Sequence, residues 1–430
     1  MKIAFVSQPG DIIAPPKLES SIAIWTYEVA RRLAQFADVI VYAKYPKKGW
    51  VKQNYDASVC YRYISISIDE RLVKLLKLLE QLSGNHNPKQ PLFSSRLYYS
   101  VYALQIAKDL RKQQCDIVHI FNSSQFIPII RSFNPNIKIV LHMHCEWLSQ
   151  LERTMIANRL NQADLVLSCS EYISGKIRQT FPKFADRCQT VYNGVDIKKF
   201  CPTDEQIKNK TNKTKKLLFV GRISPEKGIH ILLEAFEKVI ERYPETQLEL
   251  VGFTQLIPYE LIVALSDDPL VTKLASFYPD KWMSYLSQWQ NSSIANQISF
   301  IGSVPNSELV DRYQNADVFV FPSVVNEAFG IPIIEAMATE VPVVVSRSGA
   351  FEEVVEEGKT GLIVERDDAD ALAEAILQLL ADEQTRKTMA KAGRERVVAL
   401  FTYDKVVENL LYQYKNLCPR EQINVTSDRA

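Results

Sequence analysis

The sequence lacks paired cysteines and long apolar runs. Its seven cysteines, at positions 60, 115, 145, 169, 188, 201 and 418, are scattered, and no two of them form a CxxC pair. This pattern argues against a disulfide framework or a zinc knuckle and is typical of reduced thiols in the cytoplasm. No stretch approaches the roughly 18 apolar residues that a membrane-spanning helix needs. The first ten residues, MKIAFVSQPG, predict a strand rather than a signal peptide.

The chain also has almost no net charge. Its 51 Lys and Arg residues balance 50 Asp and Glu residues, which leaves a formal net charge of +1. No global field therefore favours nucleic acid or an anionic membrane, and we expect no nucleic-acid partner. The hydrophobic content of 47% and the charged content of 23% are those of a globular protein.

The length and the order of predicted elements indicate two domains. A chain of 430 residues is too long for one ordinary core, and two domains of roughly 200 residues are expected. Residues 2–7, 20–36 and 38–43 predict strand, helix and strand, which is the opening of a doubly wound sheet. The same plan starts again at residue 216. We therefore expect a first Rossmann-like domain over 1–200, a polar linker over 201–215, a second Rossmann-like domain over 216–402, a helix over 403–418 and a tail over 419–430.

Two amphipathic segments are predicted to pack on their own domains. Residues 71–82, RLVKLLKLLEQL, form a Leu-rich helix that we expect to pack against a second helix over 94–113. The alternative is that this helix lies on a membrane surface or meets a lipid acceptor. Trp282, Tyr285 and Trp289 are spaced along one helical face, and such aromatic stripes are usually core.

Residues 317–349, DVFVFPSVVNEAFGIPIIEAMATEVPVVVSRSG, are the most informative stretch. They predict strand, loop, helix and strand, with Pro332 at the first turn of the helix. Glu327 and Glu335 lie on either side of the helix start. A helix N-terminus attracts anions, so two carboxylates there suit the hydroxyl groups that flank a phosphate, as in a nucleotide-sugar. The alternative is an ordinary βαβ unit with two surface glutamates.

A second informative stretch is GRISPEKG at residues 221–228. It follows a predicted strand and opens a helix, yet it is neither a GxxxxGK[ST] nor a GxGxxG loop. Arg222 and Lys227 place two cations at this turn, where they suit a departing pyrophosphate. The alternative is a pair of surface charges beside a turn.

These motifs, taken in order, resemble a known family. GRISPEKG, LELVG, SFIGSVPNSEL and ADVFVFPSVVNEAFGIPIIEAMATEVPVVVSRSGAFEEVV are similar to the C-terminal half of family 4 glycosyltransferases. The resemblance is dense over residues 216–402 and looser over 1–200. It implies the GT-B fold, in which two Rossmann-like doubly wound domains face each other across a cleft. It also implies that the 403–418 helix crosses back to the first domain.

The resemblance implies a role for each matching position. Arg222 and Lys227 would hold the donor diphosphate, Glu335 the ribose diol, and Glu327 the hydroxyls of the donor sugar. Backbone N–H groups of Phe329, Gly330 and Ile331 would touch the sugar and the distal phosphate, and Gly302 to Val304 would line the base. His144, at the end of the strand IKIVLHMH, would face the donor sugar. The catalytic residues expected are His144, Glu327, Arg222 and Lys227.

The histidines raise the question of a metal site. His142 and His144 share one strand face and are a possible ligand pair, but no other ligand lies at a diagnostic spacing. His119 also ends a predicted strand, where we expect a core residue or an acceptor-side residue. We expect no metal and no other cofactor, because Arg222 and Lys227 supply the positive charge.

The sequence departs from the family pattern in two places. Where the family has Gly-Gly in its first loop, this chain has Lys17-Leu18-Glu19-Ser20-Ser21, so the acceptor contacts are open. Residues 254–296 form a long insertion that shapes either the base side or an interface. Asn193-Gly194-Val195-Asp196 is similar to the NGVD sequence on the hinge side of the family and is expected to be structural.

The expected function is transfer of a hexose from a UDP- or GDP-linked sugar to an acceptor, with retention of anomeric configuration. The acceptor would be a sugar, a polysaccharide or a lipid-linked sugar. A nucleotide-sugar isomerase or epimerase on the same fold, and a non-catalytic nucleotide-sugar-binding subunit, are the alternatives. We expect the protein in the cytoplasm, with peripheral membrane contact through residues 71–82 as an option.

Overall fold

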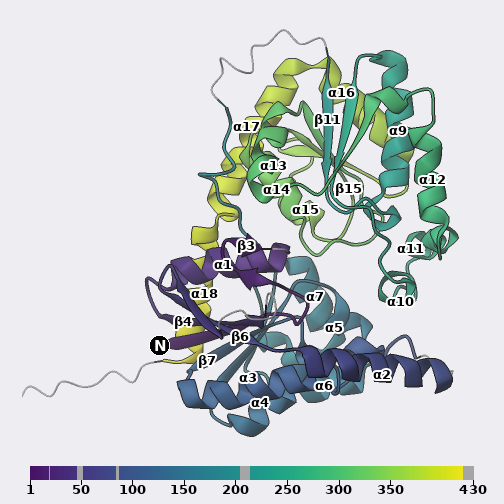
Figure 1. Ribbon diagram of the computed structural model, residues 1–430. Coiled ribbons are helices and arrows are strands. Elements are labelled where there is room, and N and C mark those ends of the chain that lie inside the picture. The colour runs from purple at the N-terminus through teal and green to yellow at the C-terminus, as the bar shows by residue number, and fades with distance from the viewer. Residues whose placement is uncertain (19, 46–51, 84–86, 204–213, 420–430) are drawn as a thin grey trace, which may run out of the picture.

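The chain folds as two α/β domains stacked one on the other (Figure 1). The computed structural model describes residues 1–18, 20–45, 52–83, 87–203 and 214–419. Most of the predicted linker and nearly all of the predicted tail lie outside these residues. Within the described part of the chain, no helix is long and apolar enough to cross a membrane.

The first domain is built on an eight-stranded sheet with the order β10-β9-β8-β7-β1-β4-β6-β5. All neighbours in it are parallel except β5, which pairs antiparallel with β6. Central strands such as β1 and β7 are buried almost throughout, as parallel strands covered on both faces must be. The strands are β1 (Lys2–Val6), β4 (Asp38–Lys44), β5 (Gln53–Asp56), β6 (Val59–Ile64), β7 (Ile117–Phe121), β8 (Lys138–Met143), β9 (Leu165–Ser168) and β10 (Cys188–Thr190), and a small hairpin joins β2 (Ile13–Ala14) to β3 (Lys17–Leu18).

Helices cover both faces of this sheet and form a separate core on each. One core includes residues of α3, α4, α6 and α7, and the other includes residues of α1 and of the C-terminal helix α18 (Tyr403–Leu417). Ser20 caps α1, because its Oγ accepts a hydrogen bond from the N–H of Ala23 at 3.0 Å. The helices are α1 (Ser21–Leu33), α2 (Ser67–Ser83), α3 (Ser100–Gln113), α4 (Ile127–Phe133), α5 (Trp147–Gln150), α6 (Arg153–Leu160) and α7 (Glu171–Thr180), with 3₁₀ turns η1 (Leu92–Ser94), η2 (Ser124–Phe126) and η3 (Pro182–Arg187).

The second domain repeats the plan on a parallel six-stranded sheet with the order β13-β12-β11-β14-β15-β16. Its strands are β11 (Lys216–Val220), β12 (Gln247–Val251), β13 (Ile298–Gly302), β14 (Val318–Phe321), β15 (Val343–Ser346) and β16 (Gly361–Val364). Its helices are α9 (Ile229–Arg242), α10 (Tyr259–Ile262), α11 (Pro269–Lys273), α12 (Lys281–Gln290), α13 (Asn306–Asn315), α14 (Ile331–Ala338), α15 (Phe351–Val354), α16 (Ala369–Ala381) and α17 (Glu383–Leu400), with 3₁₀ turns η4 (Pro225–Lys227), η5 (Leu274–Phe277) and η6 (Ala295–Gln297).

The C-terminal helix α18 (Tyr403–Leu417) leaves the second domain and packs beside α1 on the first (Figure 1). The hydroxyl of Tyr414 lies 2.6 Å from Nδ1 of the buried His119. A predicted strand-end histidine is therefore a core residue, and it ties the last helix to the first sheet.

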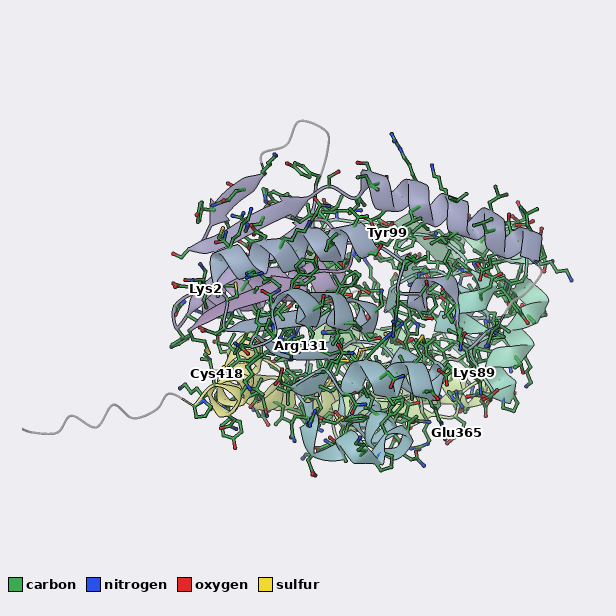
Figure 2. The ribbon with its side chains drawn as sticks, turned by 90° about the horizontal axis from the view of Figure 1, so that it is seen from below. Lys2, Lys89, Tyr99, Arg131, Glu365 and Cys418 are labelled. Atoms are coloured by element: carbon green, nitrogen blue, oxygen red, sulfur yellow. The ribbon has the colours of Figure 1, made fainter. Side chains whose placement is uncertain are left out.

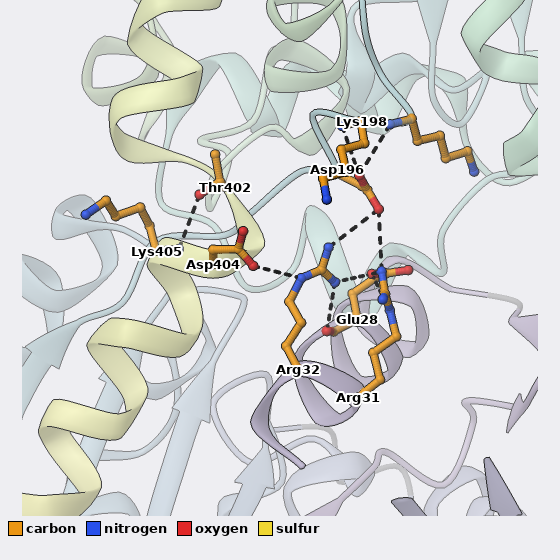
Figure 3. Close-up of polar contacts among 9 residues, drawn as sticks. Glu28, Arg31, Arg32, Asp196, Lys198, Thr402, Asp404 and Lys405 are labelled. Carbon is orange, nitrogen blue, oxygen red and sulfur yellow. Dashed lines mark hydrogen bonds and ion pairs between the residues drawn. The ribbon is translucent and has the colours of Figure 1, made fainter. Parts of the chain in front are cut away.

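The NGVD sequence lies where the two domains are joined, and Figure 3 shows the polar network around it. Arg32 of α1 pairs with Asp404 at the start of α18 at 3.1 Å and with Asp196 at 3.5 Å. A Cβ at Gly194 would lie 2.8 Å from the backbone nitrogen of Tyr403, so a larger residue would push α18 away from the junction. The sequence is structural, as its position in the family indicates.

Helix α2 differs from the expectation that its leucines are core. Only one face packs on the domain, where Val73 is buried and the carboxylate of Asp69 accepts hydrogen bonds from the first N–H groups of α3. The opposite face exposes a stripe of leucines at helical spacing, 52% exposed at Leu75 and 76% at Leu82. This stripe consists of Leu75, Leu78, Leu79 and Leu82. The predicted neighbouring helix also begins later than expected, at Ser100.

The insertion over 254–296 packs on the second domain and reaches the first. Trp282 is fully buried and donates a hydrogen bond from Nε1 to the carbonyl of Ile223 at 3.1 Å. Tyr285 stacks on Trp282 with ring centroids 5.5 Å apart, which confirms the aromatic stripe as core. Leu265, by contrast, joins a hydrophobic core of the first domain. The insertion therefore packs against the turn that carries Arg222 and contributes to the contact between the domains.

Candidate active site

Arg222 and Lys227 lie on the turn that follows β11, where η4 leads into α9. Gly228 ends this turn with φ at 72°, a left-handed conformation that glycine adopts without strain. A Cβ at Gly228 would also lie 1.9 Å from the carbonyl oxygen of Pro322. Only glycine therefore lets the turn pack on the end of β14, which places both predicted cations beside the loop that follows that strand.

Lys227 forms an ion pair with Glu327 across this junction. Its Nζ lies 2.6 Å from Oε1 of Glu327, and the hydroxyl of Ser323 donates to the same oxygen at 2.6 Å. The two charged side chains are only 18% and 12% exposed. A pair so shielded from water interacts more strongly than a surface pair. The structure thus joins two residues that sequence reasoning had assigned to different parts of the donor.

The backbone of Glu327 is held against the loop that follows β15. Its N–H donates to the hydroxyl of Ser348 at 3.2 Å, and its carbonyl accepts from the N–H of Ala350 at 2.9 Å. A Cβ at Gly349, where φ is 53°, would lie 2.3 Å from that carbonyl oxygen. The predicted sugar-binding carboxylate is therefore fixed at both its backbone and its side chain.

Arg222 is oriented by a buried glutamate on the same turn. Its Nη1 lies 3.1 Å from Oε1 of Glu226, which also accepts from the hydroxyl of Ser224 at 2.6 Å. The side chain of Glu226 is 2% exposed. The side chain of Arg222 is 24% exposed, so part of it faces solvent.

The start of α14 presents backbone donors beside the Lys227–Glu327 pair. Among the described residues, the N–H groups of Phe329, Gly330 and Ile331 have no hydrogen-bond acceptor. Unpaired N–H groups at a helix N-terminus bind anions and hydroxyls. The ring of Phe329 packs in the core, 5.5 Å from that of Phe401, so only the backbone of this residue is available to a ligand.

Glu335 lies one turn further along α14 in a different environment. It is 7% exposed, and its Oε2 accepts a hydrogen bond from the hydroxyl of Tyr313 at 2.8 Å. It also lies close enough to Lys199 to act on that charge. The two glutamates that bracket the helix start are thus unequal, since Glu327 pairs with Lys227 and Glu335 meets a tyrosine.

His144 lies at the end of β8 in the first domain. Its backbone N–H donates to Oδ1 of Asn122 at 2.7 Å, and its ring lies 4.3 Å from that of His142, centroid to centroid. Burial lowers the pKa of His144 to about 3, so the imidazole is neutral. Its Nε2 is buried without a partner among the described residues. A neutral ring of this kind can form a hydrogen bond with a sugar hydroxyl.

The carboxyl ends of the two sheets meet around these residues. The thiol of Cys169, just after β9, donates to the carbonyl of Ala328 at 3.4 Å. The carboxylate of Glu353 accepts hydrogen bonds from the backbone N–H groups of Glu171 and Tyr172, at the start of α7. At the end of β13, nothing lies within 4 Å of the position that a Cβ would take at Gly302, which is predicted to line the base.

Two family models match this chain, one for each domain. The model described as Glycosyltransferase Family 4 matches residues 22–199, and the model described as Glycosyl transferases group 1 matches residues 202–396. The chain belongs to the family 4, group 1 glycosyltransferases. The chain is 28% identical over 424 residues to the lipopolysaccharide 1,2-N-acetylglucosaminetransferase of Salmonella typhimurium, which covers 96% of this chain and 98% of that protein.

Solved structures show that this glycosyltransferase has the GT-B fold. Sucrose-phosphate synthase from Thermosynechococcus elongatus has a TM-score of 0.72 at 22% identity, covering 98% of this chain and 100% of that one. Anabaena Alr3699/HepE in complex with UDP-glucose has a TM-score of 0.66 at 20% identity, covering 97% and 100%. The predicted architecture of two facing Rossmann-like domains is confirmed.

Sequence reasoning missed three polar residues that organise the site of this glycosyltransferase. Glu226 holds Arg222, Ser323 holds Glu327, and Tyr313 holds Glu335. Glu226 lies inside the GRISPEKG motif and could have been found there. Ser323 and Tyr313 carry no local signal, because their roles depend on contacts between separate segments.

The described residues contain no group of three or more His, Cys, Asp or Glu side chains placed to hold a metal ion. His142 and His119 contact each other, with 3.0 Å between Nδ1 and Nε2, and burial lowers the pKa of each well below its usual value. Both belong to the core of the glycosyltransferase rather than to its cleft.

Proposed function

We propose that this glycosyltransferase moves a hexose from a nucleoside diphosphate sugar to an acceptor, with retention of configuration. The observation that carries the proposal is the junction of the β11 turn with the β14 loop. There Arg222 and Lys227 lie on one turn, and Lys227 pairs with Glu327 of the loop that leads to the N–H groups at the start of α14. This combination suits a diphosphate whose negative charge grows as its bond to the sugar breaks.

The roles of the residues follow from their surroundings. Arg222 and Lys227 hold the diphosphate and stabilise it as it leaves. Glu327 accepts hydrogen bonds from the sugar hydroxyls while it holds the ammonium of Lys227 in place. Glu335, further along the helix, binds the ribose diol, and the neutral His144 meets the sugar from the opposite domain.

The donor base is proposed to be uracil. A structural neighbour solved with UDP-glucose supports this choice, and a GDP-linked sugar is the alternative. The likeness to a lipopolysaccharide N-acetylglucosaminetransferase supports a saccharide acceptor in polysaccharide or glycoconjugate synthesis. We further propose that no metal is needed, because Arg222 and Lys227 would supply the positive charge at the phosphates; the rate should then be unchanged by EDTA.

The test is release of nucleoside diphosphate from a panel of UDP- and GDP-linked sugars, with saccharide extracts as acceptors. Product analysis by NMR reads the anomeric configuration. Transfer with retention supports the proposal, and transfer with inversion contradicts its mechanistic part. Conversion of a donor to its epimer without an acceptor would identify an isomerase, and tight donor binding without turnover would identify a binding subunit.

We also propose that the exposed leucines of α2 rest on a membrane surface. The stripe is flanked by the exposed cations Lys74 and Lys77, an arrangement typical of helices that lie at a lipid interface. Because Leu75 and Leu79 are exposed, replacing both with glutamate should leave the melting temperature within a few degrees of wild type. Binding to anionic vesicles should then be lost in flotation assays. Equal vesicle binding by the variant, or misfolding of it, would contradict this proposal.

A further inference from the structure

A cavity of about 230 Å³ lies in the first domain, at the carboxyl ends of β1 and β7. Its walls come from residues 8–11, 93–94, 98–99 and 122–125, and from the α5 and α6 region. Asn122 lines the cavity and also accepts the hydrogen bond from the backbone of His144. The cavity is thus separated by one residue from His144, the histidine predicted to contact the donor sugar.

Arg159 of α6 lines this cavity and is only 2% exposed. Its Nη1 donates to the hydroxyl of Ser124 at 3.1 Å and its Nη2 to the carbonyl of Ser94 at 2.5 Å. Its Nε is buried with no partner among the described residues. Neither of its two partners carries a charge, and no ion pair to Arg159 exists within the described part of the chain.

The surroundings of Arg159 leave its positive charge unbalanced. Burial and, to a smaller extent, the neighbouring charge of Arg96 lower the pKa of Arg159 to about 10. A buried cation is normally paired, because removing it from water without a counter-charge is costly. A buried guanidinium with a free N–H at a cavity wall is therefore suited to an anionic ligand.

The other walls suit a sugar ring. The rings of Phe93 and Trp147 contact each other with centroids 4.6 Å apart, and Tyr98 and Tyr99 lie on the same segment as Phe93. Figure 2 shows this side of the domain, with Tyr99 labelled at the start of α3 and α2 along the edge. Aromatic walls with a few side-chain amides, here from Gln8, Asn122 and Gln125, are typical of pockets for small polar ligands.

We propose that this cavity binds the acceptor of the transfer, and that Arg159 holds a phosphate or carboxylate group attached to the acceptor's sugar ring. The identification of the ligand as the acceptor rests on the proposed function, whereas the binding of an anionic sugar in the cavity does not. Asp11 also lines the cavity. Its two oxygens accept from the hydroxyl of Ser20 at 2.8 Å and from Nε2 of Gln8 at 3.3 Å, and burial raises the pKa of its carboxyl.

Calorimetric titration of the purified full chain tests the proposal. The probes are glucose 6-phosphate, glucuronate and glucose, together with vesicles that contain a polyisoprenyl phosphate in phosphatidylcholine. At least one anionic probe should bind ten-fold or more tightly than its neutral counterpart, glucose for the soluble sugars and plain phosphatidylcholine for the vesicles. The soluble and vesicle arms show whether the anionic group belongs to a free sugar or to a lipid.

Three variants of α6 separate a ligand role from a structural one. Arg159→Gln should weaken binding of the anionic probe ten-fold or more, and Arg159→Lys should weaken it less. Arg153→Gln, at an exposed position, should leave the affinity for the probe unchanged. Unchanged affinity in a folded Arg159→Gln variant, or equal binding of charged and neutral probes, would overturn the proposal. If Arg159→Gln does not fold, the comparison of probes on the wild-type chain still decides. Donor turnover is measured separately. Anion binding without any donor turnover would therefore refute the proposed transferase function but not the anion site.

Discussion

Replacing Lys227 with alanine tests the electrostatic core of the proposed mechanism. The Nζ of Lys227 lies at the junction where the diphosphate is proposed to bind, and its side chain is 18% exposed. At an effective dielectric constant of about 20, a unit charge about 4 Å away contributes about 4 kcal/mol. Part of this interaction energy is offset, because Lys227 also pairs with the carboxylate of Glu327. We therefore expect a loss of about 3 kcal/mol of transition-state stabilisation.

Such a loss corresponds to a decrease of roughly 100-fold in kcat/KM for the donor. The assay is release of nucleoside diphosphate under initial-rate conditions, with the best donor of the panel. The matched control is Lys238→Ala on α9, whose ammonium is 42% exposed and pairs with the exposed Asp370. The control should keep wild-type kinetics, because a surface pair contributes little.

A stability effect must be separated from the catalytic one. Lys227→Ala removes the ammonium partner of Glu327, whose side chain is 12% exposed, and leaves the hydroxyl of Ser323 as a hydrogen-bond donor to its carboxylate. This should cost about 1–3 kcal/mol of unfolding free energy. In the double variant Lys227→Ala/Glu327→Gln the uncompensated charge is gone, so stability should recover while the rate stays low. A folded Lys227→Ala enzyme within about three-fold of the wild-type kcat/KM would refute the clamp role.

Three further predictions concern the other glutamate, the histidine and the hinge. Glu335→Gln should mainly raise the Kd for the donor, whereas Glu327→Gln should mainly lower kcat; the reverse pattern would mean that the ribose and sugar ends are assigned wrongly. Because the pKa of His144 is lowered to about 3 in the folded state, its contribution to stability is fully present above pH 6.5. That contribution should fall as the pH decreases from 6.5 toward 3, which urea unfolding at stepped pH measures; flat stability over this range would contradict the buried neutral ring. Gly194→Ala should destabilise the chain by about 1–3 kcal/mol through its clash with α18, while Gly175→Ala, in open space on α7, should be neutral or stabilising by thermal melting.

Much of the fold followed from local patterns in the sequence. Short apolar runs predict buried strands such as β14, and the residues of the turn after β11 predict that turn locally. The prediction that the leucines of α2 are buried was wrong, because their burial depends on neighbouring elements rather than on the local pattern. Its periodicity predicts an apolar face, but only the packing of its neighbours decides whether that face is covered, and here α3 covers the Val73 side alone.

The site could be predicted residue by residue but not as an arrangement. Lys227 and Glu327 are 100 residues apart, and their ion pair depends on how the β11 turn packs on the β14 loop. The sequence motifs identified both residues as candidates but assigned each to a separate part of the donor. The burial of His144 and the unbalanced charge of Arg159 are likewise products of packing around β8 and α6, which no spacing in the sequence encodes.

The central claim is that the junction of Arg222, Lys227 and Glu327 cleaves a nucleoside diphosphate sugar. The most direct measurement is nucleoside diphosphate release from the panel of UDP- and GDP-linked sugars, compared between the wild-type chain and Lys227→Ala. Acceptor-dependent release from at least one donor, reduced roughly 100-fold in the variant, is the predicted result. No release from any donor with acceptor extracts present, or equal release by the two proteins, would contradict it.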